Sequence, residues 1–230
     1  MIMDSEISAT ATADSHAGIG SAEALITHDA LLQASRRLDW RFLLPDPTLR
    51  HVAYVGPAHK ALVGSLQLLS ASLTLFNTLA ACTGSPGPYD VVVARGPSYK
   101  ALKVVRELVR PGGWLYVEND RLFWSRRWWR RGARPAMPKE AWLHSPAGYV
   151  AVLERLGFAD VQSHWHWPDF EACTKIIPLD DLAALRFALA QAGGGPQAWL
   201  SDVLGHWLLS GGRLAHVVPC YSLVARRDSE

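Results

Sequence analysis

The stretch YDVVVA, Tyr89–Ala94, decides the fold of this chain. Its valine-rich run lacks the polar alternation of a half-exposed strand, which is typical of a strand covered on both faces of a parallel sheet. Helical apolar spacing follows over Tyr99–Val109 and ends at Pro111-Gly112-Gly113, and a second buried strand is predicted at Trp114–Glu118. A strand, a helix and a strand in this order favour parallel pairing through a right-handed crossover.

The same alternation continues on both sides of this unit. We expect four further strands, at His51–Val55, Ser72–Phe76, Ala159–Trp167 and Ala215–Ala225, and further helices at 58–69, 145–156, 179–191 and 197–209. Ser145 and Pro146 suit the start of a helix, and Gly157 suits its C-terminal cap. Residues 21–226 are therefore predicted to form one α/β domain, a three-layer sandwich with a mostly parallel sheet.

Composition narrows the function classes. The chain has 230 residues, 49% of them hydrophobic, which is enough for one sizeable core. A net charge of +2 implies no polyanionic partner. Cys82, Cys173 and Cys220 lie far apart without a CxxC pair, which argues against a disulfide framework or a structural zinc site and fits a reducing cytoplasm. Residues 1–20 are rich in small polar residues and are expected to be a disordered tail, and we expect neither a signal peptide nor a transmembrane segment.

Three segments resemble class I S-adenosylmethionine (SAM)-dependent methyltransferases. They are YDVVVARG with LVRPGGWLYVEND, HSPAGYVAVLERLGFADVQSHW, and HVVPCYSLVARR. The pieces DWRFLLP and WHWPDFEACTKIIPLDD are similar to a subgroup found among biosynthetic and sugar-modifying enzymes. The resemblance implies a Rossmann-like fold whose last strand is antiparallel and lies beside strand 6, with SAM as the cofactor and a small molecule or sugar as the substrate.

The cofactor loop departs from the family pattern. The family places a GxGxG-like turn after the first strand, where glycine lets the backbone approach the cofactor. In VAYVGPAHKAL only Gly56 keeps a glycine, while Ala58 and Lys60 take the other two positions. Gly56 is thus either a remnant of the cofactor turn or an ordinary glycine between a strand and a helix.

Two more departures concern the ribose and adenine contacts. Asn77 stands where the family has an acid that accepts both ribose hydroxyls. The gap between Asn77 and Tyr89 is too short for a helix, strand 3 and the adenine loop, so we expect the strand-3 edge to be missing. The residues that the resemblance assigns to the cofactor are Gly56, Ala58, Asn77 and Arg95.

The residues after the strand at Trp114–Glu118 are candidates for a pocket or lid, because ligands of open α/β sheets gather beyond the carboxyl ends of strands. They are Glu118, Asn119, Asp120 and Arg121. The alternative is a surface loop whose charges satisfy one another.

Histidines provide the weak catalytic candidates. His144 or His166 could act as a general base, because imidazole titrates near neutral pH. His164 and His166 share one face of a predicted strand and could hold a metal with His144 or Cys173, or could be half-buried imidazoles. No second ligand pair of known spacing exists, so no metal is expected.

The segment 121–134 is rich in arginine and tryptophan and lies in a predicted lid over residues 121–140. It is either a lid with buried tryptophans, a surface for a partner or substrate, or a binder of single-stranded nucleic acid or membrane. We favour the lid and expect no nucleic acid. Residues 168–214 are expected to form a helical insertion before the last strand.

These departures favour a methyltransferase-like pseudoenzyme with a degenerate SAM site, a non-catalytic or repurposed component of a biosynthetic pathway in the cytoplasm. The alternative is an active SAM-dependent methyltransferase of a small molecule or sugar, and an adaptor acting through the Arg/Trp segment is a third class. Loss of strand 3 leaves a new sheet edge, which predicts a homodimer or a heteromer with a protein partner.

Overall fold

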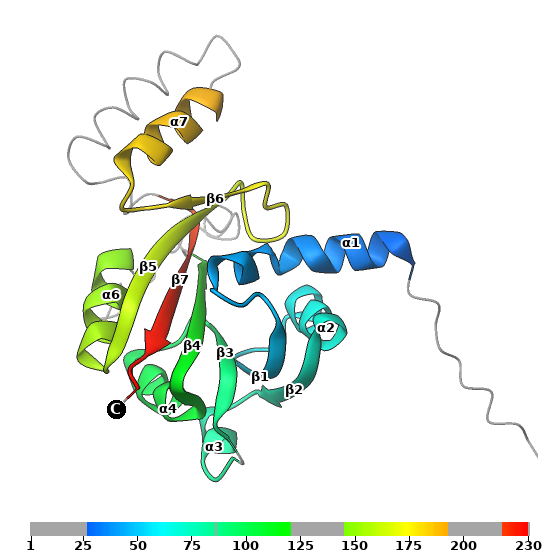
Figure 1. The fold of residues 1–230 in the computed structure, drawn as a ribbon, viewed down its shortest axis with the longest axis vertical. Helices are drawn as coiled ribbons and strands as arrows, with labels where there is room; N and C mark the ends of the chain where they lie inside the picture. The colour runs from blue at the N-terminus through cyan, green and yellow to red at the C-terminus, as the bar shows by residue number, and fades with distance from the viewer. Residues whose placement is uncertain (1–26, 86, 121–144, 193–217, 230) are drawn as a thin grey trace, which may run out of the picture.

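A seven-stranded sheet forms the centre of the protein (Figure 1). The computed structural model describes residues 27–85, 87–120, 145–192 and 218–229. The strand order is β2-β1-β3-β4-β7-β5-β6. The strands are β1 Leu49–Val55, β2 Ser70–Phe76, β3 Tyr89–Arg95, β4 Val109–Asp120, β5 Phe158–Trp167, β6 Lys175–Pro178 and β7 Cys220–Arg227.

Pairing in the sheet is parallel from β2 through β1 and β3 to β4. The last strand, β7, is antiparallel and lies between β4 and β5, and β6 adds an antiparallel edge to β5. The mostly parallel sheet and the antiparallel last strand beside the sixth strand of the family pattern are therefore confirmed.

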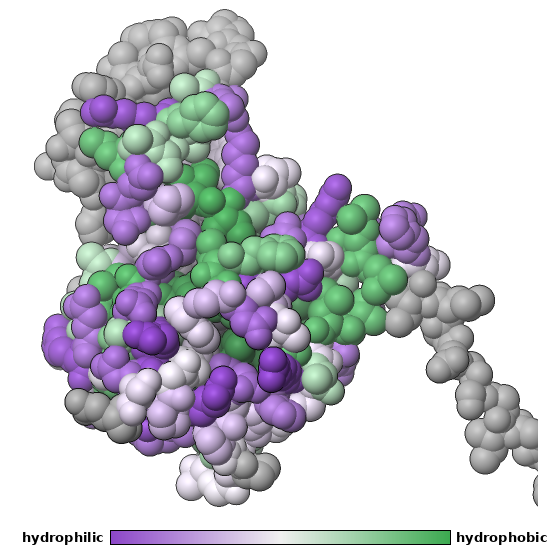
Figure 2. Space-filling model, in the orientation of Figure 1, coloured by the Kyte–Doolittle hydropathy of each residue, from purple (hydrophilic) through white to green (hydrophobic). Residues whose placement is uncertain are grey.

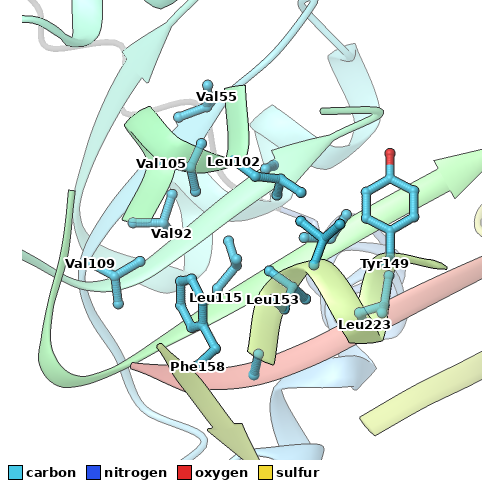
Figure 3. Close-up of a cluster of buried hydrophobic side chains, with 14 of the residues drawn as sticks. Val55, Val92, Leu102, Val105, Val109, Leu115, Tyr149, Leu153, Phe158 and Leu223 are labelled. Carbon is cyan, nitrogen blue, oxygen red and sulfur yellow. The ribbon is translucent and has the colours of Figure 1, made fainter. Parts of the chain in front are cut away.

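Helices cover both faces of the sheet and make the predicted three layers. They are α1 His28–Arg37, α2 Lys60–Leu69, α3 Leu79–Cys82, α4 Tyr99–Leu108, α6 Pro146–Arg155 and α7 Leu182–Ala192, with a 3-10 turn η1 at Asp39–Leu43. The segment α1–η1 and helix α2 pack on one face, and α4 and α6 pack on the other. Figure 3 shows the second of these cores, in which side chains of α4 and α6 meet those of β1, β3, β4 and β7.

The two cores explain the sequence of β3. Val91 and Val93 belong to the core under α1 and α2, whereas Val92 and Ala94 belong to the core under α4 and α6. All four are at most 4% exposed. Burial of a valine contributes about 1.5–3 kcal/mol, so a run without polar alternation is the stable choice for a strand covered on both faces.

The expected loss of the strand-3 edge is confirmed. Within the described residues, β2 ends the sheet, and the segment from Asn77 to Tyr89 contains the four-residue helix α3 and no strand. The parallel core survives because the missing strand would have been an edge strand.

The residues expected to begin and end a helix at 145–156 do so for α6. The Ser145 hydroxyl accepts a hydrogen bond from the Gly148 amide at 3.0 Å, Pro146 is the first residue of α6, and Gly157 has φ +77° just beyond its end. This positive φ favours glycine, so the expected C-cap is confirmed.

Two expectations about strands were wrong. Strand β4 begins at Val109 rather than Trp114, because the Pro-Gly-Gly turn lies inside the strand as an irregular stretch where the register with β3 shifts. The short edge strand β6 lies where a loop or helical insertion was expected. Helix α7 matches the first expected helix of the 168–214 insertion. The tail 1–20, the lid 121–140 and the second helix of the insertion lie outside the described residues, so the domain boundaries stay a prediction.

Candidate functional site

The carboxyl ends of β1, β3 and β4 bring most of the predicted site residues to one edge of the sheet. Gly56 follows β1 and donates its amide to the Phe76 carbonyl at 3.1 Å, which places it beside the end of β2 and Asn77. Arg95 is paired in register with Glu118, and the Gly96 amide donates to the Glu118 carbonyl at 2.8 Å. This carboxyl edge is where open α/β sheets hold their ligands.

Close packing of two strands accounts for Gly56. Its φ is +146°, and a Cβ added here would lie 3.2 Å from the Arg95 carbonyl oxygen. Both facts disfavour any side chain at this position. The backbone therefore requires a glycine here whether or not a cofactor is bound.

The segment between β1 and α2 is turned toward solvent. Ala58 and Lys60 are exposed, as is Asn77 beyond β2. The His59 ring accepts a hydrogen bond from the Leu62 amide at 3.4 Å and so caps α2, whose first residue is Lys60. One of the free amides at the start of α2, which an anionic ligand would use, is thus taken by the protein's own imidazole.

Glu118 is buried beneath α1 and bound by Arg37. The Arg37 guanidinium donates to both carboxylate oxygens, at 2.7 and 2.8 Å, and the Tyr116 hydroxyl lies 3.3 Å from one of them. Burial alone would lower the pKa of Arg37, but the hydrogen bond and the negative charge of Glu118 together raise the pKa of Arg37 above its ordinary value. The bidentate pair is among the strongest side-chain contacts that proteins make, and it fixes α1 to the carboxyl edge.

The loop between β5 and β6 closes over the same pair. Arg37 also donates from Nε to Glu171 at 3.1 Å, and its guanidinium lies 5.6 Å from the centre of the Phe170 ring. His59 Nε2 is 3.5 Å from the same Glu171 carboxylate. One arginine therefore joins α1, the end of β4 and the β5–β6 loop, and the histidine adds the start of α2.

Among the remaining candidates of this edge, Arg95 and Asp120 pair with each other, whereas Asn119 uses only its side-chain oxygen. Arg95 forms an ion pair with Asp120. Asn119 is 5% exposed, and the Tyr149 hydroxyl, which donates to the Pro97 carbonyl at 2.6 Å, lies 3.3 Å from its Oδ1. Glu118, Asn119 and Asp120 belong to strand β4 rather than to a surface loop, and the buried Asn119 Nδ2 has no hydrogen-bond partner.

His166 is enclosed by its neighbours in the protein. It is 3% exposed, with Nε2 2.8 Å from the Ser222 hydroxyl and Nδ1 3.5 Å from the Cys173 thiol. Burial lowers the pKa of His166 to about 3 and also lowers the pKa of His164. The ring is therefore neutral at pH 7 with both nitrogens engaged. The other two candidates, His144 and Arg121, lie outside the described residues.

The described part of the chain contains no cluster of side chains arranged as a metal site, and its cysteines form no disulfide. No group of three His, Cys, Asp or Glu side chains there is placed to hold a metal ion. The three cysteines are free, and burial raises the pKa of each thiol.

Protein stability is expected to fall as the pH drops below about 6.5, because burial lowers the pKa of both histidines in the folded chain. The unfolded chain binds a proton at His166 there, whereas the folded ring stays neutral down to its pKa of about 3, so His166 contributes a loss of about 1.4 kcal/mol per pH unit between these values. His166→Gln should remove this contribution to the slope, as measured by denaturant unfolding at several pH values. A slope that His166→Gln leaves unchanged would contradict the buried, neutral ring.

The two described cavities lie elsewhere. One of about 650 Å³ is lined by residues before β3 and at the end of α4, at the amino ends of the strands. One of about 330 Å³ lies between α7 and β6. None of the residues that the resemblance assigns to the cofactor lines either cavity.

Comparisons with solved structures find proteins whose backbones resemble this chain at low sequence identity. No family model and no curated protein matches the chain. A SAM-dependent methyltransferase from Archaeoglobus fulgidus is 12% identical, with 85% of this chain and 94% of that chain covered and a TM-score of 0.45. A SAM-dependent methyltransferase from Thermotoga maritima is 9% identical over 86% and 89% of the two chains, with a TM-score of 0.42.

A third similar structure is phosphoethanolamine N-methyltransferase 2 of Haemonchus contortus with S-adenosylhomocysteine (SAH), at 12% identity and a TM-score of 0.40. The match covers 89% of this chain but only 59% of that enzyme. By its strand order, with antiparallel β7 between β4 and β5 and helices on both faces, the chain has the fold of class I SAM-dependent methyltransferases. None of the helices in the described ranges combines the length and the apolar composition of a membrane-spanning segment.

Sequence reasoning missed the residues that tie the edge together. Arg37 and Glu171 were not candidates, and neither was Ser222. Arg37 lies at the end of an amphipathic helix with Arg36 beside it, and nothing in that pattern distinguishes the buried arginine from the exposed one.

Proposed function

We propose that this protein keeps the methyltransferase fold without using SAM in the usual way, and that it serves as a non-catalytic or repurposed component of a biosynthetic pathway. The observation that carries the proposal is the end of the sheet at β2. Between Asn77 and Tyr89 the described residues form helix α3 and turns but no strand, from which we infer that the segment that frames adenine in the family has no counterpart here.

The state of the carboxyl edge supports the same proposal. A cofactor needs hydrogen-bond donors and acceptors that the protein leaves free. Here Glu118 and Asp120 are each paired with an arginine, and the start of α2 is capped by His59. The ribose position carries an exposed amide, Asn77, in place of an acid that could accept two hydroxyls.

The alternative is an active SAM-dependent methyltransferase of a small molecule or sugar. One observation favours it: Ala58, Lys60 and Asn77 are all exposed, so no described side chain buries the loop where the cofactor would lie. Methyl transfer needs little beyond proximity and a correctly placed nucleophile. Binding of the cofactor therefore separates the two proposals.

Calorimetric titration of SAM and SAH into the full chain tests the proposal. We expect no saturable heat at ligand concentrations up to about 1 mM. This result would mean that any binding free energy is smaller in magnitude than about 4 kcal/mol. The double variant Ala58→Gly/Lys60→Gly restores the glycine pattern and should also fail to bind, because the adenine segment is still absent.

The blocking control is Ala58→Trp, which places a large ring in the exposed loop without the backbone strain that a substitution of Gly56 would introduce. Micromolar binding by the wild type that is lost in Ala58→Trp would overturn the proposal and favour the active enzyme. Binding gained only by the glycine-restored variant would show that the loop, rather than the missing segment, prevents SAM binding.

A further inference from the structure

In the described part of the chain, the outer side of β2 is an unpaired sheet edge. Among the described residues, β2 pairs with β1 on one side and with no strand on the other. Ser70–Phe76 contains no charged residue and no proline, the features that usually prevent edge-to-edge pairing. The strand is therefore suited to accept another strand.

The register of the free hydrogen-bonding groups follows from the pairing with β1. The Phe76 carbonyl accepts from Gly56, so Phe76 and the residues two and four before it direct their peptide groups toward β1. Because the direction alternates along a strand, Ala71, Leu73 and Leu75 direct their N–H and C=O groups outward.

Four exposed leucines lie on β2 and on two helices, and Leu75 is the one on β2 itself. Half of the eight exposed large hydrophobic residues of the described chain are on α1, β2 and α3: Leu31 at 40%, Leu32 at 44%, Leu75 at 42% and Leu79 at 36%. Figure 1 shows α1 extending beyond the sheet on the side where α2 and β2 lie, and in Figure 2 the hydrophobic surface on this side lies over α1. On β2 itself, the free peptide groups lie beside the exposed Leu75, a combination that suits an interface.

We propose that the occupant of this edge is a second copy of the chain, paired antiparallel through β2 about a two-fold axis at Leu73. Leu73 then faces its own symmetry mate, and Ala71 faces Leu75 on both sides of the axis. All three pairs consist of residues with outward peptide groups, and each pair exchanges two backbone hydrogen bonds. The strand is thus complementary to itself in the antiparallel direction.

The apolar side chains on one face of β2 and the absence of charge on this strand are both compatible with this register. Leu73 belongs to the core under α1 and α2, and by alternation Ala71 and Leu75 lie on that same face. The pairing therefore covers the exposed Leu75 with apolar side chains of the partner strand. Since β2 carries no charge, two copies meet without repulsion, whereas a charged partner segment would find no counter-ion on this strand.

Sedimentation velocity of the full chain at about 10–100 µM tests the proposal, and a dimer is expected. Leu75→Lys places two buried lysines in the interface, and Ala71→Pro removes an outward N–H that the monomer does not use, so each should weaken the dimer by roughly 100-fold. Phe187→Lys, a matched change at a 66% exposed position on α7, should leave the dimer intact.

Circular dichroism and thermal unfolding should show that each variant remains folded. A wild type that sediments as a monomer would overturn the proposal, as would a dimer that persists in both Leu75→Lys and Ala71→Pro. The proline variant keeps the test decisive if the lysine variant does not fold.

Discussion

Replacement of Arg37 by methionine is expected to lower the free energy of unfolding by about 3–5 kcal/mol. The side chains of Arg37 and Glu118 are 5% and 0% exposed and are joined by two hydrogen bonds. Removal of the guanidinium leaves a buried carboxylate without its counter-ion, which costs more than the pair contributes in its own right. Urea unfolding at neutral pH, followed by circular dichroism, measures the change.

The matched control is Arg50→Met. Arg50 pairs with Asp46 at 3.7 Å, but the two side chains are 65% and 60% exposed, so this variant should cost less than about 1 kcal/mol. The double variant Arg37→Met/Glu118→Leu should recover much of the loss, because no unpaired charge remains buried. Equal costs for Arg37→Met and Arg50→Met would show that the buried pair does not hold α1 to the sheet.

Trp40→Ala is expected to cost about 3–5 kcal/mol. The indole is 1% exposed and stacks on the Tyr116 ring, with centroids 3.9 Å apart and planes 9° from parallel. It joins the 3-10 turn after α1 to the centre of β4, so its removal opens a cavity between two layers. Denaturant unfolding measures the loss.

Two further variants serve as controls for Trp40→Ala. Phe42→Ala, at a 62% exposed position of the same turn, should have a much smaller effect. Trp40→Phe should cost less than Trp40→Ala, because it keeps most of the ring and removes an indole N–H that has no hydrogen-bond partner. A similar loss for Trp40→Ala and Phe42→Ala would contradict the role of Trp40 in the core.

The fold could be predicted because its signals are local. The apolar run of β3 predicts a buried strand because both of its faces are covered. Ser145 marks the start of α6 with its hydroxyl cap, and Gly157 marks the end with its positive φ. The missing edge strand followed from the length of the chain between Asn77 and Tyr89. Strand β6 was not predicted because four residues are too few to show a period. The start of β4 was predicted wrongly because Pro-Gly-Gly normally signals a turn.

The arrangement of the edge could be predicted only in part. The carboxyl ends of parallel strands meet by topology, so Gly56, Arg95 and Glu118 were expected together. The partner of Glu118 is Arg37, 81 residues away, and it is one of 23 basic residues with no distinguishing pattern. Which charges pair across the fold is decided by packing of α1 on the sheet, which a single sequence does not encode locally.

We propose a methyltransferase fold that does not hold SAM at its carboxyl edge, and nuclear magnetic resonance observes this edge residue by residue. SAH would be titrated into ¹⁵N-labelled protein while the amide signals of Gly56, Gly96 and Asn77 are followed. These signals are expected to stay in place up to about 1 mM ligand. Saturable shifts of all three would contradict this proposal and would place a working cofactor site beside β1 and β3.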